Sequence, residues 1–240
     1  MTGKSDGTQA PRRFYKAVTV EPVAGGHAVR LDGRGPKGPG GTPLVLPTPA
    51  LAALVAAEWD AQTTIIDMTT MPALRLAWTA LEALPPTREA VAGEVARYAG
   101  SDLLCYRADA PASLAAEQAA GWSPWLDWVA RDLAVSLVPT SGLIHQPQPD
   151  AAIETVRALA LGLDDFSLTG LAHGVGLLGS AVLALALQRG QIDGQTAHDL
   201  ARLDEAFQER LWGQDAEAAV RTEGRRQEAL LLDRWFAALR

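Results

Sequence analysis

The stretch Asp102-Leu103-Leu104-Cys105-Tyr106-Arg107 determines how this chain is to be interpreted. It holds the only cysteine, with a carboxylate before it and an aromatic ring and a guanidinium after it. A thiol among polar groups suggests a nucleophile. Two leucines and a cysteine between polar ends are equally typical of a buried strand or turn. The rest of the sequence has to decide between these two interpretations.

Before this stretch, the sequence predicts strands and then helices. Residues 17–23 and 27–31 alternate apolar with polar side chains, which is the period of a half-buried strand. Ala24-Gly25-Gly26 between them favours a hairpin turn. A third short strand is expected at 43–46. Thr48-Pro49 then predicts a capped helix start, with the helix over 50–62.

From residue 85 onward, the pattern predicts helices alone. The expected ranges are 87–98, 114–120, 124–134, 151–161, 168–188, 195–211 and 215–239. We therefore expect the α+β class. A disordered tail (1–12) precedes a small two-layer mixed α/β domain (13–85) and a larger all-α domain (86–240), with the boundary near Pro85-Pro86.

Composition excludes several classes of function. A net charge of −7 without a dense basic patch argues against nucleic-acid binding. One cysteine cannot form an internal disulfide or a thiolate metal site, and the four histidines share no metal-ligand spacing. The longest apolar run, 177–187, is well short of the ~20 residues that span a bilayer. We expect a cytoplasmic protein without signal or transit peptide, membrane insertion, metal or cofactor.

Gly174-Val175-Gly176-Leu177-Leu178-Gly179 matches the G-x-G-x-x-G pattern of dinucleotide sites. That site needs a strand before the glycines and a helix that opens at them. Here the flanking residues predict one helix over 168–188, in which glycines let neighbouring backbones approach closely. Helix packing is therefore favoured, and a nucleotide-binding module is an alternative. In the same helix, His173 is expected to be a hydrogen-bonded core residue.

Cys105 needs a neighbouring base to become a reactive thiolate, and no motif in the chain supplies one. Because free cysteine is among the most buried residue types, burial is favoured. An enzyme that uses Cys105 as a thiol nucleophile is the competing hypothesis.

Several groups of residues then carry a family resemblance. In order, they are Arg13-Phe14-Tyr15-Lys16, Leu31-Asp32-Gly33-Arg34, Glu58-Trp59-Asp60-Ala61-Gln62, Met71-Pro72 with Leu76-Ala77-Trp78-Thr79-Ala80, Ser101 to Ala108, Gly179-Ser180 with Leu183 to Leu187, and Leu203-Asp204-Glu205 with Gln208 and Trp212-Gly213. Together they resemble the Atp12 family of assembly chaperones for the F1 sector of ATP synthase, in a bacterial member. The chain departs from the family pattern in the longer loop at 35–41 and at Asp67-Met68.

The resemblance implies an orthogonal helical bundle after the α/β domain and a role without catalysis. It implies that the chain binds the unassembled F1 α subunit until the β subunit replaces it. It places the partner-binding site at Glu205, with Asp204, Gln208 and Trp212 on the same segment. A solvated helix carboxylate is the alternative for Glu205.

The resemblance also implies a structural signature. Its residues are Trp59, Asp60, Asp102, Cys105, Tyr106 and Arg107. No catalytic, cofactor-binding or metal-binding residue is expected. The sequence does not set the oligomeric state, for which we expect a monomer.

Overall fold

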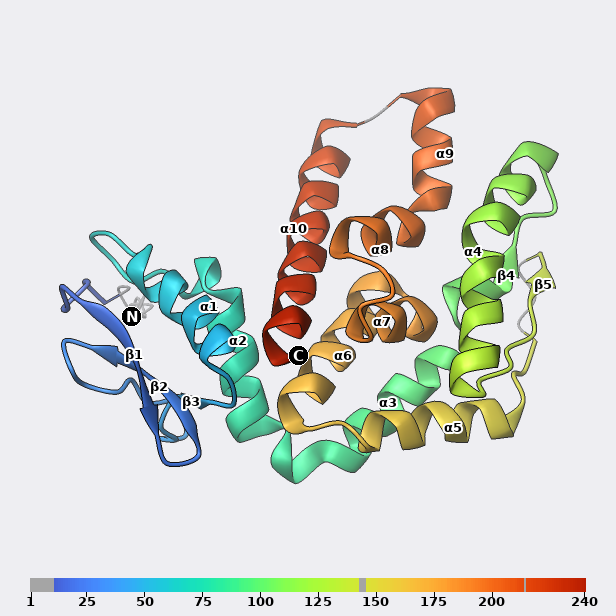
Figure 1. Ribbon diagram of the computed structural model, residues 1–240. Coiled ribbons are helices and arrows are strands. Elements are labelled where there is room, and N and C mark those ends of the chain that lie inside the picture. The colour runs from blue at the N-terminus through green and yellow to red at the C-terminus, as the bar shows by residue number, and fades with distance from the viewer. Residues whose placement is uncertain (1–10, 143–145, 214) are drawn as a thin grey trace, which may run out of the picture. The chain divides into compact units, whose positions relative to one another are not determined.

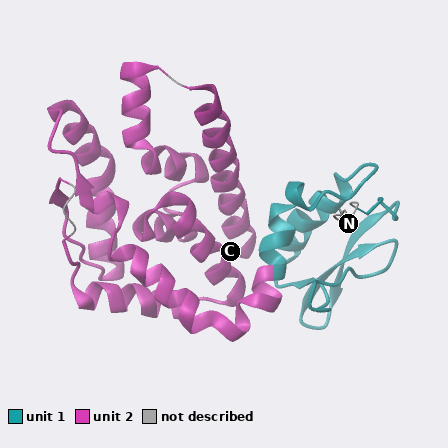
Figure 2. Cartoon of the chain, turned by 180° about the vertical axis from the view of Figure 1, so that it is seen from behind, with its two compact units in different colours: residues 1–78 teal, residues 79–240 magenta. Residues whose placement is uncertain are grey.

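A computed structural model describes residues 11–142, 146–213 and 215–240. The chain divides into two compact units, residues 1–78 and residues 79–240 (Figures 1 and 2). The first unit is a mixed α/β unit and the second is helical, so the predicted α+β class is confirmed. Among the described residues, no helix combines the length and the apolarity that a membrane span requires.

The first unit combines a three-stranded sheet with the helices α1 and α2. Strands β1 (Val18–Val23), β2 (Gly26–Leu31) and β3 (Val45–Leu46) form an antiparallel sheet in the order β1-β2-β3. The β1–β2 turn contains Gly25 with a positive φ of 87°, a conformation that glycine adopts without strain. Helix α1 (Pro49–Asp60) packs on this sheet with a buried face that ends at Trp59.

Local capping explains the helices of this unit. The Thr48 hydroxyl accepts a hydrogen bond from the Leu51 amide at 3.0 Å, as the Thr48-Pro49 pattern predicts. A short 3₁₀ turn, η1 (Met68–Thr70), precedes α2 (Pro72–Trp78). At the start of α2, the Glu58 carboxylate accepts from the amides of Ala73 and Leu74, each at 2.8 Å. A carboxylate is stabilising there because the first amides of a helix lack intrahelical partners.

The two limits of the predicted α/β domain differ from the structure. Residues 1–10 of the expected tail lie outside the described residues. Residues 11 and 12 are held in place by two contacts. Arg12 forms an isolated antiparallel β-bridge with Ile65, and the amide of Ile66 donates to the Pro11 carbonyl at 2.8 Å. At the other end, the division falls after Trp78 instead of residue 85. The reason is that α2 continues into a π-helical turn, η2 (Thr79–Ala83), which packs against α6 of the second unit.

The second unit is built around one buried helix. Its elements are η3 (Pro85–Thr87), α3 (Arg88–Ala99), η4 (Leu103–Cys105), β4 (Tyr106–Arg107), α4 (Ala112–Leu133), β5 (Thr140–Ser141), α5 (Asp150–Leu161), α6 (Asp165–Leu178), α7 (Ala181–Gln188), α8 (Gly194–Ala201), α9 (Leu203–Trp212) and α10 (Ala216–Leu239). Every residue of α7 from Ala181 to Leu187 is buried. Helices α3, α4, α6, α8 and α10 all contact α7 (Figure 1), which explains why its sequence is apolar on every side.

Three predicted helix boundaries are wrong. The helix expected over 168–188 is two helices, because Gly179 adopts φ 66° and Ser180 caps the start of α7. The helix expected over 195–211 is likewise interrupted at Arg202, between α8 and α9. Conversely, the expected helices 114–120 and 124–134 are one helix, α4, which includes Pro124. Proline removes one helical hydrogen bond, and here it lies at an exposed position.

Packing at the end of α1 supports a structural role for Trp59. The indole is 7% exposed, and the Tyr15 ring meets it edge-on at 5.8 Å between centroids. The Tyr15 hydroxyl donates to the Trp59 carbonyl at 2.6 Å. Next to it, the Arg13 guanidinium donates to the Asp60 carbonyl at 2.9 Å and lies 3.4 Å from the Asp60 carboxylate.

We predict that Trp59→Ala lowers the free energy of unfolding by about 3–5 kcal/mol, since it leaves a cavity between α1 and the sheet. Urea unfolding followed by circular dichroism measures this change. Trp212→Ala is the matched control, because Trp212 is 77% exposed and its loss should change stability by no more than about 0.5 kcal/mol. Equal stability of Trp59→Ala and the wild type would contradict the structural role.

Candidate functional site

The Asp102 carboxylate is fully buried and hydrogen-bonded through both oxygens. Oδ1 accepts from the Leu104 amide at 3.0 Å and from the Ser180 hydroxyl at 2.7 Å, and Oδ2 accepts from the Val182 amide at 3.0 Å. The Leu103 amide also donates to the Gly179 carbonyl at 3.1 Å. Asp102 therefore fixes η4 to the corner at which α6 ends and α7 begins.

Cys105 is also fully buried. Burial, and then the neighbouring Asp102 carboxylate, raise the pKa of its thiol to about 12. At neutral pH the thiol is protonated, whereas nucleophilic cysteines have a lowered pKa and access to a substrate. The geometry therefore favours packing over the nucleophile hypothesis.

Tyr106 and Arg107 form β4, which pairs in parallel with β5. The Arg107 guanidinium donates to the Gln118 carbonyl and, at 3.3 Å, to the Ser123 hydroxyl. It lies 5.2 Å from the centroid of the Trp122 ring, within range of a cation–π interaction. Arg107 thus joins the chain segment after Cys105 to the middle of α4.

Gln118 of α4 extends this connection to α9. The side chain is 1% exposed, its Oε1 accepts from the Ala108 amide at 2.7 Å, and its Nε2 donates to Asp204 Oδ1 at 2.7 Å. In parallel, the Trp122 indole donates to the Leu200 carbonyl at 2.9 Å. Both bonds fix the α8–α9 connection to α4. We call the series Arg107–Gln118–Asp204 the polar relay.

Sequence reasoning did not identify Gln118. Leu114, Gln118 and Trp122 recur every four residues, so a glutamine lies on the buried stripe of α4. A buried amide needs hydrogen-bond partners, which makes such a position informative. Because separate helices were expected over 114–120 and 124–134, the continuous buried stripe of α4 was not apparent from the sequence.

The four predicted partner-binding residues separate into two groups. Asp204 faces α4 and is bonded to Gln118. Glu205, Gln208 and Trp212 are exposed, and their spacing of three and four residues places them on a common face of α9. Within the part of the chain that the structure describes, the Glu205 carboxylate has no hydrogen-bond or ion-pair partner.

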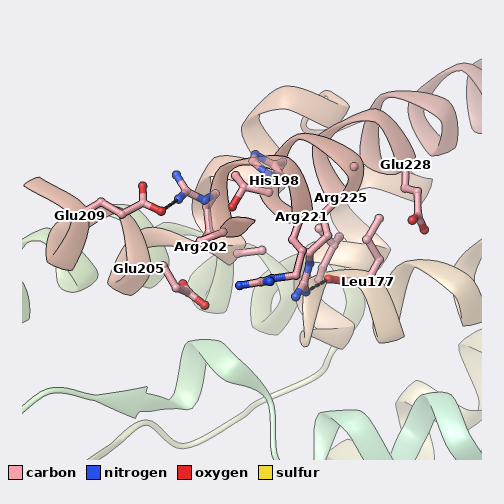
Figure 3. A pocket seen from close by; sticks show the side chains of 13 residues that line it. Leu177, His198, Arg202, Glu205, Glu209, Arg221, Arg225 and Glu228 are labelled. Carbon is pink, nitrogen blue, oxygen red and sulfur yellow. Dashed lines mark hydrogen bonds and ion pairs between the residues drawn. The ribbon is translucent and has the colours of Figure 1, made fainter. Parts of the chain in front are cut away.

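Glu205 borders a groove of about 450 Å³ between α9 and α10. The walls and floor consist of Leu177, Leu178, His198, Ala201, Arg202, Glu205, Glu209, Ala218, Arg221, Thr222, Gly224, Arg225 and Glu228. Figure 3 shows charged side chains from both helices gathered around this space. Arg202 pairs with Glu209 at 2.6 Å, and Arg225 donates to the Leu177 carbonyl.

His173 is not the core residue that the sequence predicts. Its side chain is half-exposed, and its Nε2 lies 3.0 Å from the Glu228 carboxylate. Among the described residues, no three His, Cys, Asp or Glu side chains cluster closely enough to hold a metal ion.

The glycines at 174–179 lie in and at the end of α6, which begins at Asp165. No strand leads into them and no helix opens at the first glycine, so the context that a dinucleotide site requires is missing. A Cβ at Gly174 would lie 3.4 Å from the Ala184 Cβ of α7. Gly174 therefore serves the helix packing that the sequence predicts, and Gly179 ends the helix.

Three comparisons with known proteins agree with one another. The model of the family described as ATP12 chaperone protein matches residues 12–130. The chain is 25% identical to the mitochondrial protein atp12 of Schizosaccharomyces pombe over 214 residues, which are 84% of this chain and 74% of the relative.

The chain is also similar to solved structures. Atp12 from Paracoccus denitrificans is 43% identical with a TM-score of 0.90, over 96% of this chain and 99% of that protein. The Atu1473 protein from Agrobacterium tumefaciens is 37% identical with a TM-score of 0.89, over 96% of this chain and 87% of that protein.

We predict that Gln118→Ala lowers the free energy of unfolding by about 1–3 kcal/mol, because the Ala108 amide and the Asp204 carboxylate lose their buried partner. Chemical denaturation measures this change. Gln208→Ala is the control, because Gln208 is exposed on α9 and its truncation should leave stability within about 0.5 kcal/mol of the wild type. A Gln118→Ala protein as stable as this control would show that the hydrogen bonds of Gln118 do not stabilise the fold.

Asp102 predicts a pH dependence of stability. Burial raises the pKa of its carboxyl to about 6, although the hydrogen bonds from Ser180, Val182 and Leu104 oppose the shift. In the unfolded chain, the pKa is about 3.9, so the folded state holds more protons between these two values. The contribution of Asp102 to stability is therefore fully present below about pH 4 and is lost as the pH rises through about 6.

At about 1.4 kcal/mol per pKa unit, this loss is on the order of 3 kcal/mol. The measurement is the urea midpoint of the wild type and of Asp102→Asn from pH 4 to pH 7. We expect the decline that Asp102 causes to be missing from the variant. The same decline in both proteins would show that another group is responsible.

Proposed function

Because the chain belongs to the ATP12 family of chaperones for ATP synthase assembly, we propose that it binds the unassembled α subunit of the F1 sector and yields it to the β subunit. The chain acts by binding alone, as a monomer. In a bacterial member the encounter takes place in the cytoplasm. An α subunit without its neighbours exposes an apolar interface that favours aggregation, and a protein that covers this surface prevents it.

The observation that carries this proposal is the exposed apolar end of the α9–α10 pair. Trp212 is 77% exposed, Leu211 59% and Val220 74%. Large apolar side chains on a surface mark sites of interaction, and tryptophan is prominent among the residues that dominate binding energy. These three residues therefore form the apolar part of the contact.

Glu205 forms the polar part of the contact. Its carboxylate is exposed, while the adjacent Asp204 is engaged by Gln118. Asp204 thus sets the rotation of α9, which presents Glu205 and Gln208 outward. A solvated carboxylate without a binding role is the alternative for Glu205, and it predicts that charge reversal has no effect on the client.

Release requires no energy source. A contact of the standard size, about 1,200–2,000 Å² of buried surface, is specific yet reversible. The β subunit then competes for the same interface on α. The competing hypothesis, thiol chemistry at Cys105, gains no support from a buried sulfur whose pKa is raised.

We predict that Trp212→Ala and Glu205→Lys each weaken binding of the isolated F1 α subunit at least tenfold, because truncated or reversed anchors typically cost more than about 1.4 kcal/mol. Isothermal titration or an aggregation assay with isolated α measures the effect. Both side chains are exposed, so we expect unchanged circular dichroism and thermal stability.

The matched control is Glu154→Lys, which reverses an exposed carboxylate on α5. This control should bind like the wild type. Full activity of both α9 variants would refute the assignment of this surface. A wild-type chain that does not bind isolated α would refute the proposed function itself.

A further inference from the structure

We propose that the α/β unit carries a second contact surface for the client, and that this surface binds an acidic segment with an apolar side chain beside its carboxylates. Arg12, Phe14 and Lys16 of one chain segment and Ile65 of the segment paired with it form this surface, which we call the cationic face. The inference rests on the proposed function, and it adds a contact made by residues other than those of α9.

The side chains of residues 12–16 alternate between exposed and inward-facing. Arg12, Phe14 and Lys16 are exposed, whereas the two residues between them are half-buried and buried. This is the period of an extended chain, in which every second side chain points to the same side. Arg12 also forms the antiparallel bridge with Ile65, so these two side chains lie on that same side. An exposed aromatic ring therefore lies between two cations, with an aliphatic side chain opposite one of them.

The backbone under the cationic face is fixed from the inside. The Arg13 amide donates to the Thr64 carbonyl at 3.1 Å, and the Tyr15 hydroxyl donates to the Trp59 carbonyl at 2.6 Å. Phe14 itself meets the Tyr15 ring edge-on at 5.3 Å between centroids, yet it stays 70% exposed. A segment that is already ordered loses little conformational entropy when a partner binds it.

Large apolar side chains are exposed in two main places on this chain. One is the end of the α9–α10 pair. The other is in the α/β unit, where Phe14 is 70% exposed, Ile65 50% and Met68 39%. Val138 is the remaining large apolar side chain of comparable exposure among the described residues. Single exposed apolar residues need no explanation, but grouped ones mark sites of interaction.

The negative charge of the chain is unevenly distributed between its two units. Residues 1–78 contain eight lysines and arginines and six aspartates and glutamates, whereas residues 79–240 contain thirteen and twenty-two. The formal net charges of the two units are therefore +2 and −9. A positive surface on the α/β unit is a local property, opposite in sign to the whole chain.

The carboxylates of the α/β unit are already engaged by other groups. Within residues 11–78, each accepts a hydrogen bond or pairs with an arginine, and they are Glu21, Asp32, Glu58, Asp60 and Asp67. By contrast, Arg12, Lys16 and Arg34 form no ion pair with any residue that the structure describes. Arg34 lies close to the cationic face, because Asp32, two residues before it, accepts from the Lys16 amide at 3.1 Å. These cations are available to an incoming carboxylate.

An acidic protein segment fits this surface better than an extended anionic surface does. A short segment meets the local charge of Arg12, Lys16 and Arg34, and a carboxylate pairs with arginine through two hydrogen bonds. A membrane or a nucleic acid meets the charge of the whole chain, and a net charge of −7 opposes its approach. The exposed Phe14 ring calls for an apolar side chain beside the carboxylates, because such a contact removes both from water.

The test compares Phe14→Ala and the double variant Arg12→Glu/Lys16→Glu with two matched controls. Val138→Ala truncates a 54% exposed apolar residue outside both groups. Lys37→Glu reverses an exposed cation of the same unit, in the loop before β3. For each protein, the Kd for the isolated F1 α subunit is measured by isothermal titration between 50 and about 500 mM NaCl, a range over which screening changes strongly. The melting temperature is measured alongside.

We expect Phe14→Ala to weaken binding of α about fivefold or more and the double variant to weaken it more than tenfold at low salt, while both controls bind like the wild type. The double variant should also reduce the rise of Kd with NaCl, because it removes the attraction for carboxylates. All four melting temperatures should stay within about 2 °C of the wild type, because the changed side chains are exposed. Weaker binding at an unchanged melting temperature separates a contact role from a folding role.

In the Trp212→Ala background, the loss caused by Phe14→Ala should multiply with the loss caused by Trp212→Ala, since residues without shared contacts contribute independently. Wild-type affinity of both cationic-face variants would overturn the inference. It would leave the proposed function in place, because the wild type would still bind α.

Two other occupants would also overturn the inference. One is a membrane, shown by binding of the wild type to phosphatidylglycerol vesicles that Phe14→Ala abolishes. The other is the acidic helical unit of a second copy, shown by self-association that the double variant abolishes. Failure of the wild type to bind α would overturn the proposed function, and with it the inference.

Discussion

The buried carboxylate of Asp102 is the constraint on which the helical unit depends. Its two oxygens bind both the start of η4 and the first turn of α7. Five other helices of the unit contact α7. A carboxylate accepts several bonds at once from amides and a hydroxyl, which no apolar side chain can do. The cost is the burial of a charge, visible in the raised pKa of the Asp102 carboxyl.

The polar relay connects the segment that follows η4 to α9 at the surface of the helical unit. Arg107 fixes the segment after η4 to α4, Gln118 joins α4 to Asp204, and the next residue of α9 is the exposed Glu205. The contacts of Asp102 and Arg107 are structural, and Cys105 between them is buried. They determine the orientation of α9, whose outer face carries the exposed Glu205, Gln208 and Trp212.

Elements that depend on local sequence signals could be predicted from the sequence, and features that depend on tertiary contacts could not. The Thr48 cap and the alternation in β1 and β2 are local, and they locate these elements closely. The break at Gly179-Ser180 is not visible in an apolar run, because burial on all sides removes helical periodicity. The family pattern indicated the Leu203-Asp204-Glu205 segment, yet only the contact with Gln118 distinguishes which acid faces inward.

The exposed end of α9 also bears on how copies of this chain behave toward each other. A surface that attracts the apolar face of a client would equally attract the same surface on a second molecule. The chain carries a net charge of −7, and Arg210, Glu217 and Arg221 are exposed near the apolar side chains in sequence. Mutual repulsion and the cost of desolvating these charges oppose such pairing. The charge of the chain therefore offsets the tendency of the exposed Trp212 to cause self-association.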